Sequence, residues 1–141
     1  MALTLKLAHA CLERGRAKAQ ELGFKVAITV VDEAGHLVLC ERMDGALWVT
    51  PEIARAKANA AVAFQANTLD LEERFSTGRQ LFASSVATLG AYQFVFGKGG
   101  VPVVEGGRVV GAVGVSGAVP AENDHVIAEA AAGHPATVKG H

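Results

Sequence analysis

Two apolar hairpins, each turned at glycine, constrain this chain more than any other feature of its sequence. The first hairpin covers residues 25–43, with alternating side chains on both arms and Gly35 in the turn. The second joins strands expected over 101–104 and 108–116 through the Glu-Gly-Gly sequence at 105–107. Glycine supplies the positive φ that a tight hairpin turn requires. Tight turns pair their two arms antiparallel, so the sequence predicts an antiparallel sheet.

Helical periodicity surrounds the hairpins. Small and apolar residues recur every three or four positions over 5–22, where Thr4 is the predicted N-cap and Gly23 the residue that ends the helix. An alanine-rich helix is predicted over 51–66, with Pro51 in its first turn.

Two further helices are predicted after these. Thr68 is expected to cap a short helix that ends at Arg74, and a last helix is expected over 120–132. The segment 79–96 is interpreted as helix followed by loop or edge strand, and the tail 134–141 as flexible. The order helix, hairpin, helices, hairpin, helix favours an α+β fold with helices packed on a sheet.

Composition limits the partners of the chain. Its 141 residues fit a single domain over 1–141, and a net charge of −1 gives no electrostatic reason to expect nucleic acid or a membrane surface as a partner. Lys6, His9 and Glu13 interrupt the apolar residues of the N-terminus, which argues against a signal peptide or a membrane span, so we expect a cytoplasmic protein. Because alanine and glycine bury little area, self-association is also expected.

Five stretches of the sequence occur together in one known family. They are VVDEAGHLV, ERMDGA, IARAKANAA, GGVPVV and VVGAVGVSG, followed by Asp124 and a helix. With these stretches in this order, the chain resembles, up to about Gly133, the GlcG/HbpS-like domain, which is also found at the C-terminus of PduO-type proteins and is often called haem-degrading or haem-binding.

The resemblance carries several expectations. It implies a three-layer α/β/α arrangement with a central antiparallel sheet of about five strands, similar to profilin or PAS-like domains. It implies a homo-oligomer, a tetramer or an octamer, that binds a small-molecule ligand such as haem or a corrinoid. It also implies a link to the metabolism of small organic acids or diols. The stretches 75–96 and 118–121 depart from the family pattern where pocket walls are expected, which leaves the identity of the ligand open.

Two cations are candidate ligand-binding residues. Arg42 closes the first hairpin beside Asp44; it either forms a surface ion pair or grips a ligand carboxylate with its planar fork of donors. Lys57 lies on the apolar side of its helix; it either extends outward along its stem or offers a cation or a proton to a ligand. We expect Arg42 and Lys57 to project into one hollow.

Backbone groups are predicted to form the remaining walls of this hollow. The sequence GKGGVP either clusters N–H groups into an anion-binding concavity or simply begins a strand. The end of the second hairpin, leading to Asp124, is the expected opposite wall. The predicted ligand- or cofactor-binding set is Arg42, Lys57, Gly99, Gly100, Val101, Pro102, Ser116 and Gly117.

A haem iron requires an axial ligand such as histidine, cysteine, methionine or tyrosine. Among the candidates, His9 and His125 are favoured over Cys40, and the three are retained as possible ligands of the metal.

Two functions of different classes follow. The first is a small oligomeric haem- or tetrapyrrole-binding protein of the GlcG/HbpS type. The alternative is an enzyme acting on a small organic (di)carboxylic acid, with Arg42 and Lys57 binding carboxylates and with Asp44, Asp124 or Glu52 as acid or base. A third possibility is an oligomeric accessory protein with an empty pocket.

Overall fold

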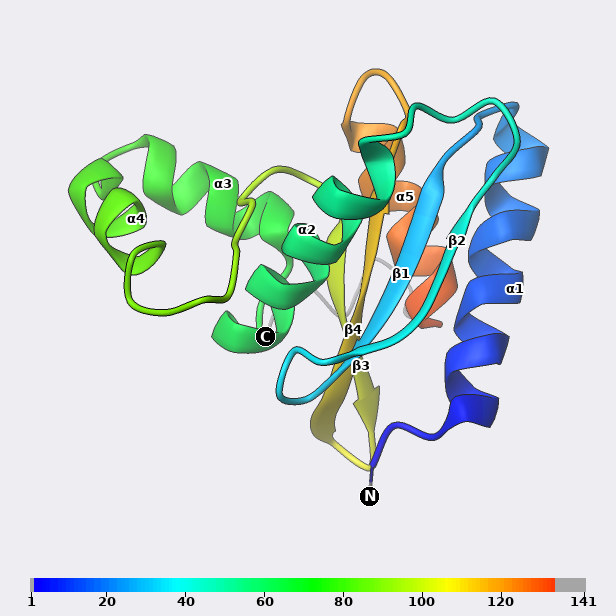
Figure 1. Ribbon diagram of the computed structural model, residues 1–141, viewed down its shortest axis with the longest axis horizontal. Helices are drawn as coiled ribbons and strands as arrows, with labels where there is room; N and C mark the ends of the chain where they lie inside the picture. The colour runs from blue at the N-terminus through cyan, green and yellow to red at the C-terminus, as the bar shows by residue number, and fades with distance from the viewer. Residues whose placement is uncertain (1, 134–141) are drawn as a thin grey trace.

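The two predicted hairpins form the centre of the molecule. In the computed structural model, which describes residues 2–133, β1 (Ala27–Asp32) pairs with β2 (Leu37–Arg42), and β3 (Gly100–Glu105) pairs with β4 (Arg108–Ser116). β1 and β4 also pair antiparallel, and this pairing joins both hairpins into one sheet of order β2-β1-β4-β3 (Figure 1).

The expectation of about five strands is wrong for the described part of the chain, where the sheet has four. The segment 79–96, interpreted as helix followed by loop or edge strand, forms α4 (Gln80–Val86) followed by chain without a strand up to Gly99, which agrees with the loop alternative. The antiparallel α+β class is confirmed, and the likeness to profilin or PAS-like domains stays a prediction.

Helices cover both faces of the sheet. α2 (Thr50–Phe64) crosses one face, with its closest packing against β4 and β1. α1 (Leu5–Leu22) and α5 (Glu122–Ala132) pack against each other and cover the other face (Figure 1). The result is the expected α/β/α layering. The predicted ends of α1 are also confirmed, since the Thr4 hydroxyl accepts a hydrogen bond from Leu7 N at 3.1 Å and Gly23 has φ 81°.

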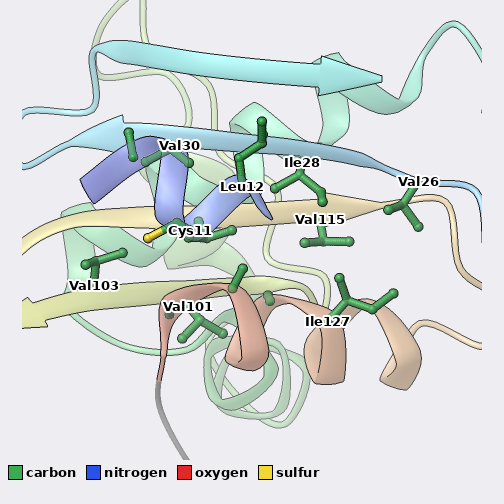
Figure 2. Packing of buried hydrophobic residues seen from close by; sticks show 14 of the residues in the cluster. Cys11, Leu12, Val26, Ile28, Val30, Val101, Val103, Val115 and Ile127 are labelled. Atoms are coloured by element: carbon green, nitrogen blue, oxygen red, sulfur yellow. The ribbon is translucent and has the colours of Figure 1, made fainter. Parts of the chain in front are cut away.

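The main core lies between the sheet and the α1–α5 pair. Figure 2 shows valine and isoleucine side chains of the strands meeting Cys11 and Leu12 of α1 and Ile127 of α5. A smaller apolar cluster lies under α2, where Val31 and Ala112 of the sheet contact alanines of the helix. α2 approaches the sheet so closely that a Cβ at Gly114 would overlap the carbonyl oxygen of Ala54. Alanine and glycine are therefore packing requirements of this face.

The predicted alternation of β2 is interrupted by a bulge. Val30 pairs with Leu39 but Val31 pairs with Leu37, so Val38 is the extra residue. Beyond the bulge the predicted alternation resumes. Glu41 points to α1, and Cys40 lies on the α2 side, where its sulfur accepts a hydrogen bond from the Thr29 hydroxyl at 3.4 Å.

α3 (Thr68–Ser76) and α4 extend away from the sheet as an arm (Figure 1). The arm is held by aromatic rings packed edge to face around Phe64, with centroid separations of 5.8–6.3 Å; they belong to Phe75, Phe82, Phe94 and Phe96. These rings therefore contact one another, and they form the core of the arm.

The predicted cap of α3 is wrong. Asn67 occupies the N-cap position and Thr68 is the first residue of the helix, buried. The Thr68 hydroxyl accepts a hydrogen bond from Gly100 N at 2.7 Å and so ties α3 to the start of β3. The predicted flexible tail, 134–141, lies outside the described residues. Within 2–133, no helix combines the length and the apolar character that crossing a bilayer requires.

Candidate functional site

A buried ion pair joins three elements at one end of the sheet. Lys57, on the sheet side of α2, and Asp124, in the first turn of α5, are 5% and 3% exposed. The Lys57 ammonium donates to Asp124 Oδ2 at 3.2 Å and to the Val115 carbonyl of β4 at 2.9 Å. The other carboxylate oxygen, Oδ1, accepts the Ala118 N–H at 2.9 Å. The pair therefore fixes α2, β4 and α5 relative to one another.

Burial sets the electrostatics of the pair. Desolvation lowers the pKa of Lys57 and raises the pKa of Asp124, and in each case it outweighs the opposing charge of the partner. Both shifts favour the neutral forms, which brings the two proton affinities closer together. Such a pair either transfers a proton to a bound molecule or serves as a structural cross-link, since both uses perturb the pKa in this way.

The glycine loop before β3 covers the pair. At Gly99 (φ 128°) an added Cβ would lie 3.1 Å from Lys57 Nζ and 3.0 Å from Asp124 Cβ, so a side chain here would press on the ion pair. The Gly99 carbonyl accepts the Val115 N–H at 2.9 Å, and the Gly100 N–H already donates to Thr68. The loop thus brings its backbone against the pair and binds neighbouring elements.

The other predicted backbone positions lie close by. Val101 and Pro102 are buried in β3, and Ser116, also buried, ends β4. Gly117 is exposed and has φ 129°, at the start of the turn that leads to α5. Gly99, Gly100 and Gly117 therefore lie next to Lys57 or Asp124, whereas Val101 and Pro102 continue into the sheet, where they pair with Val113 and Ala112.

A second layer of charge lies outside the pair. Lys98 donates to Glu72 of α3, and its ammonium lies 4.0 Å from a carboxylate oxygen of Glu122 at the start of α5. The Glu72 charge also acts on Lys57. The sequence analysis did not name Glu72, Lys98 or Glu122. The only signal for them was the lysine inside the glycine-rich loop, and the sequence gives no pairing over this separation.

Arg42 and Asp44 lie elsewhere, at the exposed end of β2. Both line a groove of about 560 Å³. The lining residues are Arg16, Gln20, Gly23, Phe24, Lys25, Glu41, Arg42, Met43 and Asp44. Lys57 does not line this groove, and its ammonium is directed to Asp124 and Val115. The prediction that Arg42 and Lys57 project into one hollow is therefore wrong: Arg42 lines the groove, and Lys57 is enclosed against Asp124.

The candidate iron ligands differ in accessibility. His9 is exposed on α1, and within residues 2–133 its imidazole makes no hydrogen bond or ion pair; Cys40 is exposed on β2. His125 is only 9% exposed, its Nε2 lies 3.3 Å from a Glu129 carboxylate oxygen, and its Nδ1 is enclosed with no hydrogen-bond partner in the described part of the chain. His9 and Cys40 are therefore accessible from the surface, whereas His125 is enclosed.

The fold and these two places define a class: a small α/β/α protein with an antiparallel sheet, a buried Lys–Asp pair and an open groove lined with cations. The sequence profile of the family described as "Haem degrading protein HbpS-like" matches residues 3–133. The chain belongs to this family.

Three known proteins illustrate the relationship. Protein GlcG of Escherichia coli (strain K12) is 35% identical over 114 residues, 81% of each chain. The crystal structure of a PduOC:heme complex superposes with a TM-score of 0.83 at 30% identity, covering 94% of this chain and 94% of that one. A double mutant of Streptomyces reticuli HbpS superposes with a TM-score of 0.82 at 30% identity, covering 100% of this chain and 89% of that one.

Proposed function

We propose that this chain is a small homo-oligomeric protein that binds haem or a related tetrapyrrole. The observation that carries the proposal is its similarity to the PduOC chain solved with haem, at 30% identity over 94% of this chain. Membership of the haem-degrading HbpS-like family supports the same ligand. The iron of a bound haem supplies redox and Lewis-acid chemistry, while the protein supplies an axial ligand and the surroundings of the porphyrin.

His9 is the proposed axial ligand. Its imidazole is exposed on α1 and free of partners among residues 2–133, so either ring nitrogen is available to iron. Cys40 is the second accessible candidate, on the opposite side of the sheet from α1. His125 is the third, and it must first leave Glu129 and its enclosed position.

A haemin titration followed by absorption tests this proposal. We expect a saturable Soret shift at about one equivalent per chain in the wild type, which His9→Ala abolishes. His36→Ala is the matched control, since His36 is an exposed histidine on the β1–β2 turn. Loss of the shift in Cys40→Ala or His125→Ala alone would move the axial ligand to that residue. A wild type without a saturable Soret shift would refute haem binding.

A second candidate function is an enzyme acting on a small organic acid. The buried Lys57–Asp124 pair favours it, because opposed pKa shifts of neighbouring groups are typical of acid–base sites. In this function Lys57 and Asp124 exchange the proton with a substrate bound next to them, while Arg42 and Asp44, which line the separate groove, take no part. Calorimetry with malonate tests it: Lys57→Ala should remove the heat of binding and Arg42→Ala should leave it unchanged, and an unchanged heat in Lys57→Ala would refute it.

Self-association is part of the proposal. Several apolar side chains remain on the surface of the isolated chain, among them Trp48 at 77% and Val119 at 83% exposure. Burying them between subunits is favourable, so we expect a tetramer or octamer, measured by light scattering after size exclusion. A monomer at micromolar concentration would contradict this part of the proposal. The cytoplasmic location also remains a prediction.

A further inference from the structure

The groove beside β2 has the shape and chemistry of a ligand site. The C-terminal half of α1 forms one wall, and the connection 23–25 before β1, the end of β2 and the two residues that follow β2 form the rest. Its volume of about 560 Å³ lies within the range of small-molecule pockets, roughly 300–1,000 Å³.

Arg16 and Glu41 neutralise each other on the wall of the groove. The guanidinium donates two hydrogen bonds of 2.7 Å, one to each carboxylate oxygen. This bidentate geometry links α1 to β2 and lowers the pKa of Glu41. Glu41 is thus held as an anion beside Arg16, and this pair adds little net charge to the groove.

Arg42 and Lys25 are the two cations that remain. Both are exposed, and within residues 2–133 neither forms an ion pair with a carboxylate. The Lys25 stem lies against the turn at Gly45. Asp44 is the one lining carboxylate besides Glu41. Two cations and one anion leave the groove with an excess of about one positive charge.

Two half-buried apolar side chains complete the lining. Phe24 and Met43 both pack against the main core, and the Met43 N–H donates to the Val26 carbonyl at 3.0 Å. The strand backbone therefore fixes the apolar wall next to the cations. A ligand that fits this lining carries one negative charge on an apolar body.

We propose that this groove binds a single carboxylate attached to an apolar body, with Arg42 as the bidentate donor and Lys25 as the second cation. Arginine presents two parallel donors that match a carboxylate, and the nearby ammonium adds attraction without further geometric demands. Asp44 selects against dianions, because a second negative charge would face its carboxylate.

Two sources present this chemistry: a free aromatic or aliphatic monocarboxylate, or one propionate of a haem. Only the haem source rests on the proposed function. The free monocarboxylate is supported by the charges of the groove alone and does not depend on haem binding.

Phenylacetate is the probe for the free carboxylate, with 2-phenylethanol as its uncharged analogue, and both are titrated while backbone amide shifts are recorded. We expect phenylacetate to shift the amides of Lys25 and Arg42 to saturation. Arg42→Gln weakens its binding about 10- to 100-fold, the range of one charge-assisted hydrogen-bonded contact. Arg55→Gln is the matched control, since Arg55 is exposed on α2 and outside the groove; its affinity equals that of the wild type.

Haemin and its dimethyl ester distinguish the two sources. If a propionate occupies the groove, esterification weakens binding in the wild type but has little further effect in Arg42→Gln. If haemin does not bind while phenylacetate does, the groove proposal stands and the haem proposal fails. The groove proposal is overturned if phenylacetate leaves the groove amides unshifted, or if Arg42→Gln binds it as tightly as the wild type.

Discussion

Removing one member of the Lys57–Asp124 pair gives the sharpest test of the architecture. Lys57→Met keeps a long unbranched side chain in the same volume but leaves Asp124, 3% exposed, with the backbone N–H groups of Ala118 and Gly117 and without the Lys57 charge. Breaking a buried ion pair from one side costs about 3–5 kcal/mol, because the remaining charge stays desolvated. For a chain of this size, 1 kcal/mol corresponds to roughly 3 °C in Tm, so we expect Tm to fall by about 10–15 °C.

The penalty should also depend on pH with a definite sign. Burial raises the pKa of Asp124 already in the wild type, and the charge of Lys57 opposes that rise. Without Lys57 the folded-state pKa of Asp124 moves further above its unfolded value of 3.8. The folded variant therefore holds its proton more tightly than the unfolded chain. Its stability is greatest below the unfolded pKa and falls as pH rises through the folded pKa. The penalty of Lys57→Met should thus be larger at neutral pH than at pH 4–5.

Urea denaturation followed by circular dichroism measures these free energies of unfolding. Asp124→Asn and the double variant Lys57→Met/Asp124→Asn complete a mutant cycle. We expect the double variant to lose clearly less stability than the sum of the two single variants, since it buries no uncompensated charge. Single variants that each lose less than about 1 kcal/mol, or a strictly additive double variant, would refute the claim that the pair is desolvated and coupled.

Three further predictions follow. Gly114→Ala should prevent folding or destabilise the chain by several kcal/mol because its Cβ would overlap the Ala54 carbonyl, whereas Gly78→Ala, with open space around it, should be neutral; circular dichroism and expression as folded protein compare them. Glu41→Gln should cost about 0.5–1 kcal/mol at pH 7, allowing for solvent screening. That cost should vanish as pH falls from about 4.5 through the lower folded pKa of Glu41, so an equal cost at pH 3 and pH 7 would contradict the Arg16 contact. Phe64→Ala should accelerate amide hydrogen exchange in α3 and α4 more than in the sheet. Equal acceleration in both would show that the arm is not a separate packing unit.

Local patterns predict most of the elements. Period-two alternation and the turn glycines identify both hairpins, and the spacing over 5–22, with Thr4 and Gly23 at its ends, identifies α1. These features depend on residues within a few positions of one another, so the sequence is sufficient. The expectation of a fifth strand was wrong, because no local pattern distinguishes an edge strand from the aromatic segment that packs on Phe64.

The sequence also marks single residues that matter without giving their partners. Lys57 is conspicuous as a charge on the apolar side of a helix, yet its partner, Asp124, lies 67 residues away along the chain. Thr68 was interpreted as a helix cap, while its actual partner is Gly100. Each pairing depends on how α2, α3 and α5 dock on the sheet, which no local spacing encodes.

The sequence by itself determined the two hairpins and the N-terminal helix α1, because hydrogen bonding and turn geometry over short separations fix them. It also supplied the small residues that allow α2 to approach the sheet closely. Only the tertiary structure decided that Lys57 is enclosed against Asp124 while Arg42 faces an open groove. Burial is a property of the packed layers, and it directs one cation to a neighbouring carboxylate and leaves the other available to a ligand.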